Sequence, residues 1–316
     1  MYSEYFDIQP LAEGVYAAIG QDSPAAASNA GIIDLGDQVL VFDTFTTSRA
    51  GHALRQAAEA LTGKPVRCVL LSHFHYDHWC GNQAFEARTV LLSTHETRRL
   101  MGPLAEQILE QKKNPSPFRK RIAAEEQRLA QESDPCWQAT LQASLARSRL
   151  ALQDLADLQP RLPEHTFDGR LGFYGTRGYA ELVDCGLGHT RSDACLVLPK
   201  ARLAFIGDLG SFAQQPSMHY GDAPAWKAHL QNLEASELEI FVPGHGPVGG
   251  KADLRRLREY MDTLESLVRQ VVQSGGSLEN AVKISLPTPF DAWLLGGMHR
   301  FEKNVKYFYN RLSKAN

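Results

Sequence analysis

Short apolar runs dominate the first third of the chain and predict β-strands, because strands of this length bury a continuous or alternating apolar face. The expected strands are residues 14–19, 29–35, 39–42, 66–71 and 89–92. Between the third and fourth runs, residues 48–61 carry apolar side chains at helical spacing instead. The order predicts hairpins followed by a strand–helix–strand unit.

From about residue 95 to residue 163 the pattern changes to leucines spaced among Gln, Glu, Arg, Lys and Ala, which is typical of helices. Two proline-containing breaks, Asn114-Pro115-Ser116-Pro117 and Asp134-Pro135, divide this stretch. We therefore expect two or three helices inserted between strands. Three roles stay open for them: inert decoration, a lid over a functional site, or a dimer surface.

Strand patterns return after the insertion and then give way to helices. The expected strands are residues 166–174, 179–184, 194–198, 203–206 and 239–242. The expected helices are residues 223–233, 251–272 and 291–312. We expect a single domain over residues 1–316, with a helical insertion at residues 96–163 and C-terminal helices at residues 251–316.

Composition and charge exclude several classes of function. The net charge of −3 offers no electrostatic footprint for nucleic acid. No run of about 18 apolar residues suggests a membrane span. The N-terminus has neither a basic start nor an apolar core, so we expect no secretory signal. The five cysteines are scattered without a C-x-x-C motif, which favours reduced thiols and a cytoplasmic location.

The most informative stretch is residues 70–82, where His73, His75, Asp77 and His78 follow a predicted strand. Alternate residues of a strand share a face, so we expect His73 and His75 to reach one metal ion together. Asp77 and His78 lie just beyond, where a loop can direct them to a second ion. Neutral imidazoles and a carboxylate suit zinc, and also iron or manganese.

Three later residues add to this cluster. His189 follows Gly188 in a turn before a predicted strand, Asp208 ends another strand, and His245 stands in the sequence Pro243-Gly244-His245-Gly246. Taken alone, a histidine in such a position is more often structural, and a strand-end aspartate is more often a turn or helix-cap residue. Their distances from the first motif favour a shared metal site.

Together these motifs resemble the metallo-β-lactamase superfamily, from about residue 11 to residue 248 apart from the insertion. The resemblance implies an α/β fold in which two sheets pack between helices, the four-layer αββα sandwich. It also implies two groups of metal ligands, bridged by Asp208: His73, His75 and His189 for one ion, and Asp77, His78 and His245 for the other.

The resemblance further implies a reaction. Two divalent ions, zinc first and iron or manganese as alternatives, would convert a shared water into a metal-bound hydroxide. The hydroxide would attack the carbonyl of a small ester, lactone, thioester or amide, a β-lactam among them. Asp77 would orient the nucleophile or pass a proton to the leaving group. In the loop at residues 209–222, His219 and Tyr220 either contact substrate or pack the loop.

Other activities share this fold and stay as alternatives. One is an iron-dependent oxidoreductase of the persulfide dioxygenase type, which uses one iron with fewer ligands. Another is an RNase Z-like nuclease, although the acidic net charge and the lack of a basic arm count against it. His75 stands where flavodiiron oxidoreductases carry a carboxylate, which favours hydrolysis. We expect a small-molecule substrate, no nucleic-acid or membrane partner, and a possible homodimer.

Overall fold

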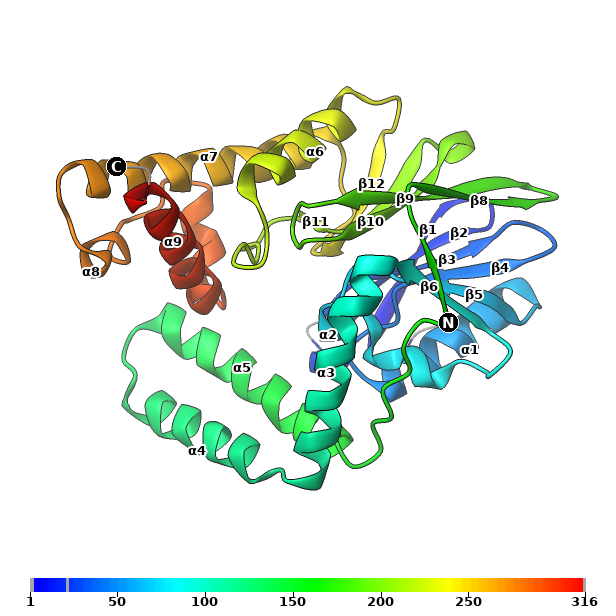
Figure 1. Ribbon diagram of the computed structural model, residues 1–316, viewed down its shortest axis with the longest axis horizontal. Helices are drawn as coiled ribbons and strands as arrows, with labels where there is room; N and C mark the ends of the chain where they lie inside the picture. Colours follow the sequence, from blue (N-terminus) through cyan, green and yellow to red (C-terminus); the bar gives the residue numbers. More distant parts are fainter. Residues whose placement is uncertain (1–2, 21–22, 315–316) are drawn as a thin grey trace.

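Two β-sheets packed face to face between helices form the centre of the fold (Figure 1). The computed structural model describes residues 3–20 and 23–314. Within these ranges, helices cover the outer face of each sheet, so the layers run helix, sheet, sheet, helix. The predicted α/β class and αββα sandwich are confirmed.

The first sheet has seven strands in chain order, and only its later strands run parallel. The pairs β1–β2, β2–β3 and β3–β4 are antiparallel, whereas β4–β5, β5–β6 and β6–β7 are parallel. Its strands are β1 (Phe6–Ala12), β2 (Val15–Gly20), β3 (Ala30–Asp34), β4 (Val39–Phe42), β5 (Val66–Leu70), β6 (Val90–Thr94) and β7 (His165–Phe167).

The second sheet has five strands in the order β12-β11-β10-β9-β8. Its only parallel pair within the described residues is β11–β12, which brings the C-terminal ends of these two strands together. Its strands are β8 (Arg170–Gly175), β9 (Gly178–Gly186), β10 (Asp193–Leu198), β11 (Leu203–Ser211) and β12 (Ile240–His245).

Three apolar layers hold these sheets and helices together. One lies between the sheets, where Phe42 of β4 and Phe205 of β11 meet with ring centroids 5.9 Å apart. A second packs helices α1 (Ser48–Thr62) and α3 (His95–Lys113) against the first sheet. A third packs α6 (Ala223–Ala235) and α7 (Lys251–Gln273) against the second sheet. Burial of these layers supplies the main driving force for the fold.

Local sequence sets the ends of the helices. Thr47 accepts a hydrogen bond from the Ala50 amide at the start of α1, and Gly63 ends that helix in the left-handed conformation. Proline residues at the first turns of α4, α5 and α6 fit positions that need no amide donor. The remaining helices are α2 (Tyr76–Trp79), α4 (Ser116–Gln131), α5 (Pro135–Asp154), α8 (Leu278–Ala281) and α9 (Met298–Ser313). Short 3₁₀ turns occupy Pro24–Ala26, Cys80–Ala84, Pro199–Ala201 and Phe290–Leu294.

Helices α4 and α5 extend beyond the sandwich and meet the C-terminal helices there (Figure 1). The Thr140 hydroxyl of α5 accepts a hydrogen bond from the Met298 amide at the start of α9, at 3.1 Å. Beside this bond, the Trp137 and His299 rings contact each other edge to face, with centroids 5.1 Å apart. The inserted helices are therefore held at both the sandwich and the C-terminal region.

The predicted strands differ from the structure in three places. No strand was predicted where β1 lies. The expected strand at residues 166–174 is two strands in different sheets, because Gly169 turns the chain with a φ of 72° between β7 and β8. The expected strand at residues 203–206 continues to Ser211, so Asp208 lies inside β11 and not at its end.

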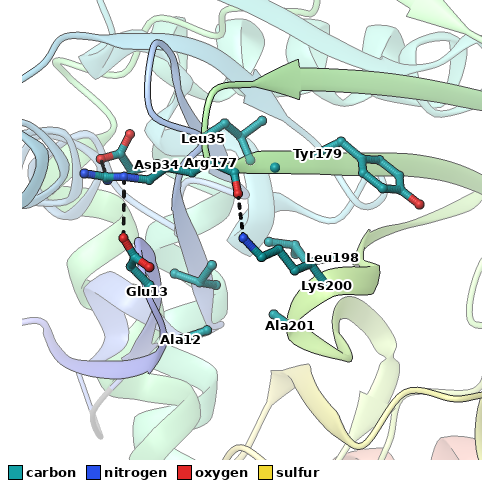
Figure 2. A pocket seen from close by; sticks show the side chains of 11 residues that line it. Ala12, Glu13, Asp34, Leu35, Arg177, Tyr179, Leu198, Lys200 and Ala201 are labelled. Carbon is teal, nitrogen blue, oxygen red and sulfur yellow. Dashed lines mark hydrogen bonds and ion pairs between the residues drawn. The ribbon is translucent and has the colours of Figure 1, made fainter.

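A pocket of about 160 Å³ lies at the end of the sandwich where β5 and β11 begin (Figure 2). Arg177 reaches across this end to the buried Asp34 carboxylate, and Lys64 pairs with the same carboxylate at 2.8 Å. Lys200 donates to the Arg177 carbonyl at 3.2 Å. These charges join the first sheet to the β8–β9 hairpin.

Within the described ranges, no helix combines the length and the apolar character needed to cross a bilayer.

Candidate metal centre

The histidine motif lies at the opposite end of the sandwich, directly after β5. Strand β5 ends at Leu70, so His73 and His75 do not share a strand face as predicted. Both stand in the connection that leads to α2, and the backbone of His75 is extended at the N-cap of that helix. Asp77 and His78 lie in α2, where the prediction had a loop.

The first cluster consists of His73, His75, His189 and Asp208, which offer ligand atoms within 4.8 Å of one another. His75 Nδ1 lies 2.9 Å from His73 Nε2 and 3.0 Å from His189 Nε2. His73 and His189 are fully buried, and His75 is half-buried. Three imidazoles from two distant segments therefore converge on one point.

The second cluster consists of Asp77, His78 and His245, which also offer ligand atoms within 4.8 Å of one another. His245 Nε2 lies 3.3 Å from Asp77 Oδ2, and His78 Nε2 lies 4.0 Å from the same oxygen. The seven residues expected to bind metal thus form two adjacent groups.

Asp208 joins the two clusters through its two carboxylate oxygens. Oδ2 lies 3.2 Å from His189 Nε2 in the first cluster and 3.4 Å from His245 Nε2 in the second. Oδ1 lies 3.1 Å from His78 Nε2. The approach is tight, because a Cβ on Gly244 would fall 2.0 Å from Asp208 Oδ1. The glycine before His245 leaves room for this carboxylate.

Asp43 supports the first motif from the end of β4, and this role was not predicted. Its Oδ2 lies 2.7 Å from His78 Nδ1 and accepts from the Ser72 hydroxyl at 2.7 Å. Its Oδ1 accepts from the Ser72 amide at 2.8 Å. The Ser72 hydroxyl also lies 2.9 Å from His73 Nδ1. One buried carboxylate therefore orients imidazoles of both clusters.

Other supports fix His245 and Asp77. His245 Nδ1 lies 2.9 Å from the Ala27 carbonyl, which points its Nε2 toward Asp208. The Ser28 hydroxyl donates to the Asp77 carbonyl at 2.5 Å. The segment around Ala27 and Ser28 thus holds one residue from each half of the fold.

The loop that carries His189 is held by Asp193. This buried carboxylate accepts from the Thr190 hydroxyl at 2.7 Å and from the Thr190 amide at 3.0 Å. Burial raises the pKa of Asp193 to about 7, although the Thr190 bonds oppose that change. The Trp226 ring lies edge to face with the His189 ring, with centroids 5.0 Å apart. These contacts limit the rotation of the imidazole.

The imidazoles of the first cluster are set to stay neutral. Burial lowers the pKa of His75 to about 4 and that of His189 to about 3, and burial with the His78 charge lowers the pKa of His73 well below its usual value. A neutral imidazole is the form that binds a metal ion. Burial opposes ionisation of Asp208, but the charges of His245 and His78 hold its pKa well below the ordinary range.

The chemistry of the donor set fits divalent ions. His78 Nε2 and Asp208 Oδ1 are buried and lie 3.1 Å apart, and neither forms a hydrogen bond of normal geometry with any described residue. Buried polar atoms without partners are costly, so a ligand that both atoms can bind is expected. Imidazole nitrogens with carboxylate oxygens are the donors that zinc and iron prefer.

His219 and Tyr220, the expected substrate contacts, lie at the rim of the centre. The Tyr220 ring is 53% exposed and packs against the His75 ring, with centroids 5.2 Å apart. His219 stacks on Tyr220 at 4.0 Å and contacts the Ser217 hydroxyl through Nδ1 at 3.1 Å. Tyr220 is therefore next to a candidate ligand and open to solvent, whereas a role in substrate binding stays a prediction.

A family model for the metallo-beta-lactamase superfamily matches residues 24–245, which include both clusters. The chain belongs to the metallo-β-lactamase superfamily. The resemblance seen in the motifs is thus confirmed for the family and its fold. The superfamily consists generally of hydrolytic metalloenzymes, and the clusters described above are a candidate metal-binding site within it.

Solved structures with the same fold share little sequence with this chain. A metallo-beta-lactamase from Pontibacter korlensis is 16% identical with a TM-score of 0.56, and the match covers 80% of this chain and 97% of that one. The FIM-1 metallo-beta-lactamase from Pseudomonas aeruginosa, in its mono-zinc form, is 17% identical with a TM-score of 0.54, covering 81% and 94%. An Erythrobacter litoralis metallo-beta-lactamase is 17% identical with a TM-score of 0.56, covering 82% and 97%. A comparison with curated proteins gave no match.

Proposed function

We propose that this chain is a dinuclear metallohydrolase that acts on a small ester, lactone, thioester or amide. The observation that carries the proposal is the position of Asp208. Its two oxygens face imidazoles of both clusters, at 3.2 Å from His189 and 3.1 Å from His78. A carboxylate between two groups of donors offsets the repulsion between two cations and sets their spacing.

The expected ligands are His73, His75 and His189 for one ion, Asp77, His78 and His245 for the other, and Asp208 for both. Two divalent ions, zinc first with iron or manganese as alternatives, supply Lewis acidity when bound, which lowers the pKa of water and polarises a carbonyl group. The outer contacts of Asp43 and Ser72 keep the imidazoles in the orientation that binding needs.

Asp77 is the candidate proton carrier. Burial opposes its ionisation, but the charges of His78 and His245 hold the pKa of Asp77 well below the usual range, so the side chain stays ionised. An ionised carboxylate beside the centre would accept a hydrogen bond from an attacking water, and with so low a pKa it would carry the proton only briefly before passing it to the leaving group. Its partial exposure leaves it accessible to substrate. Tyr220, at the rim, would contact the substrate on entry.

Metal analysis followed by a substrate screen tests this function. We expect about two divalent ions per chain, on the basis of the two donor groups, and hydrolysis of at least one ester, lactone, thioester or β-lactam. A single tightly held iron with oxygen consumption on a persulfide would support the dioxygenase alternative. Hydrolysis of a phosphodiester alone, with salt-dependent RNA binding, would support a nuclease.

A further inference from the structure

A cavity of about 230 Å³ lies between the inserted helices and the sandwich. Its walls come mainly from α3, α4 and α5, and Figure 1 shows α3 beside α2. Apolar side chains such as Ile108, Phe118, Leu150 and Leu155 supply most of the exposed area of the lining, and its charged residues are Arg121, Arg147 and Asp154. Pockets with such a lining and a few polar groups are typical of sites for small apolar ligands.

The cavity is adjacent to the candidate metal centre. Tyr76 and Cys80 line it, and they flank Asp77 and His78 in the chain. On another wall, the Thr46 hydroxyl accepts a hydrogen bond from the Ala27 amide at 3.2 Å. The Ala27 carbonyl contacts His245 Nδ1, so Ala27 links Thr46 in this wall with a candidate ligand.

Arg147 is a charged group in the wall of this cavity. It lines the cavity and is exposed to solvent, so this end of the cavity is not sealed. Loss of hydration and the nearby Arg300 charge lower the pKa of Arg147, while the Asp77 charge acts in the opposite direction. A carboxylate or carbonyl oxygen beside Arg147 would gain a charge-assisted hydrogen bond.

We propose that this cavity binds an unbranched acyl chain of the substrate, with the reacting carbonyl at the metal centre. The substrate class is thus a medium-chain acyl ester or thioester, which rests on the proposed hydrolytic function. A cavity of about 150 Å³ can hold benzene, so this one has room for roughly nine heavy atoms.

Binding of fatty acids of different length tests the cavity without any need for turnover. Octanoate and acetate share the carboxylate, so the difference in their affinities measures the contribution of the acyl chain. Octanoate has six more methylenes than acetate. We expect octanoate to bind the purified protein at least about fiftyfold more tightly than acetate, because burial of only three of these methylenes already contributes roughly fourfold each. Calorimetry measures both constants.

Variants of α5 test whether the acyl chain binds in this cavity. Ala151→Trp fills the cavity and should remove the advantage of octanoate over acetate, whereas Ala146→Trp makes the same change at an exposed position of α5 and should keep it. Ala151→Leu, a smaller change, should move the preferred chain length from octanoate toward hexanoate. This second variant keeps the test decisive if the tryptophan variant does not fold.

The outcomes separate the two proposals. Equal binding of octanoate and acetate, or octanoate binding unchanged in both Ala151 variants, would overturn the cavity assignment. Faster hydrolysis of p-nitrophenyl octanoate than of p-nitrophenyl acetate, lost in Ala151→Trp, would support both proposals. Octanoate binding in the cavity without hydrolysis of any ester, lactone, thioester or amide would leave the cavity assigned and overturn the hydrolytic function.

Discussion

Asp43 and His78 are joined across 2.7 Å between Oδ2 and Nδ1, and both side chains are completely buried. Asp43 takes this position with a φ of 59°, a left-handed conformation that few residues other than glycine adopt. The same carboxylate accepts two bonds from Ser72. This backbone conformation thus places the Asp43 charge beside Nδ1 of His78, whose Nε2 faces Asp208.

Asp43→Asn should weaken the second cluster more than the first. Asparagine tolerates the left-handed backbone but removes the charge that orients His78. We expect the affinity of the weaker-bound metal to fall by about 10- to 100-fold. Competition with a chromophoric chelator measures this, and Asp37→Asn, at an exposed turn, serves as the control. Unchanged affinity in the Asp43 variant would mean that Ser72 and packing alone orient His78.

Asp208→Asn should lower the metal occupancy of one cluster more than that of the other. The amide keeps the shape of the carboxylate but loses the charge and one good donor oxygen. His73, His75 and His189 still form a three-histidine group, so metal content should fall toward one ion per chain. The rate should fall by at least about a hundredfold, because both clusters lose a shared ligand. Elemental analysis and kinetics check the two effects. Two tightly held ions with near-normal turnover would contradict bridging.

Much of the fold and of the candidate site could be predicted, because the signals are local. The run at residues 39–42 coincides with β4, and the helix expected at residues 48–61 coincides with α1 within one residue. The candidate ligands are histidines and carboxylates grouped in short motifs, and these residue types indicate metal binding. The seven expected ligands therefore come together in the structure in the two expected groups.

The features that were missed depend on contacts between distant segments. Strand β1 is mostly exposed or half-buried and contains Pro10, so its apolar pattern is weak. Asp43 reaches Ser72 and His78 only because β4 and β5 pair as parallel neighbours. Residue type alone does not indicate which strands pair. The cavity requires the packing of three helices, whose sequence indicates helices but not their placement.

Thr140→Val should loosen the contact between the inserted helices and α9. Valine has the shape of threonine but cannot accept the bond from the Met298 amide. We expect a loss of about 0.5–1.5 kcal/mol in the stability of this contact, the usual net contribution of one hydrogen bond, because the Met298 amide is only half-buried. Hydrogen exchange and limited proteolysis of α4 and α5 report it. Thr140→Ser retains the hydroxyl and should behave like the unchanged chain. Equal protection in both variants would show that side-chain packing alone holds this contact.

Asp34 should make stability depend on pH at the end of the sandwich remote from the metal centre. Burial opposes its ionisation, but the bonds from Lys64 and the Gly36 amide and the charge of Arg177 lower the pKa of Asp34 below its usual value. Figure 2 shows Asp34 beside Arg177. The ionised carboxylate therefore favours the folded state. This contribution is fully present above the unfolded pKa of about 3.9 and is lost as pH falls through the lower folded pKa.

Asp34→Asn should lower the free energy of unfolding at pH 7 by about 1–2 kcal/mol, a modest value because Lys64 and Arg177 are partly exposed. The difference from the unchanged chain should be constant above about pH 5 and shrink below about pH 4, where the carboxylate becomes protonated in the unfolded state. Urea unfolding of both proteins with chelator present, at several pH values, measures it. Asp168→Asn, at an exposed position, should change neither value. A difference that stays constant down to pH 3 would show that shape, and not charge, is what Asp34 contributes.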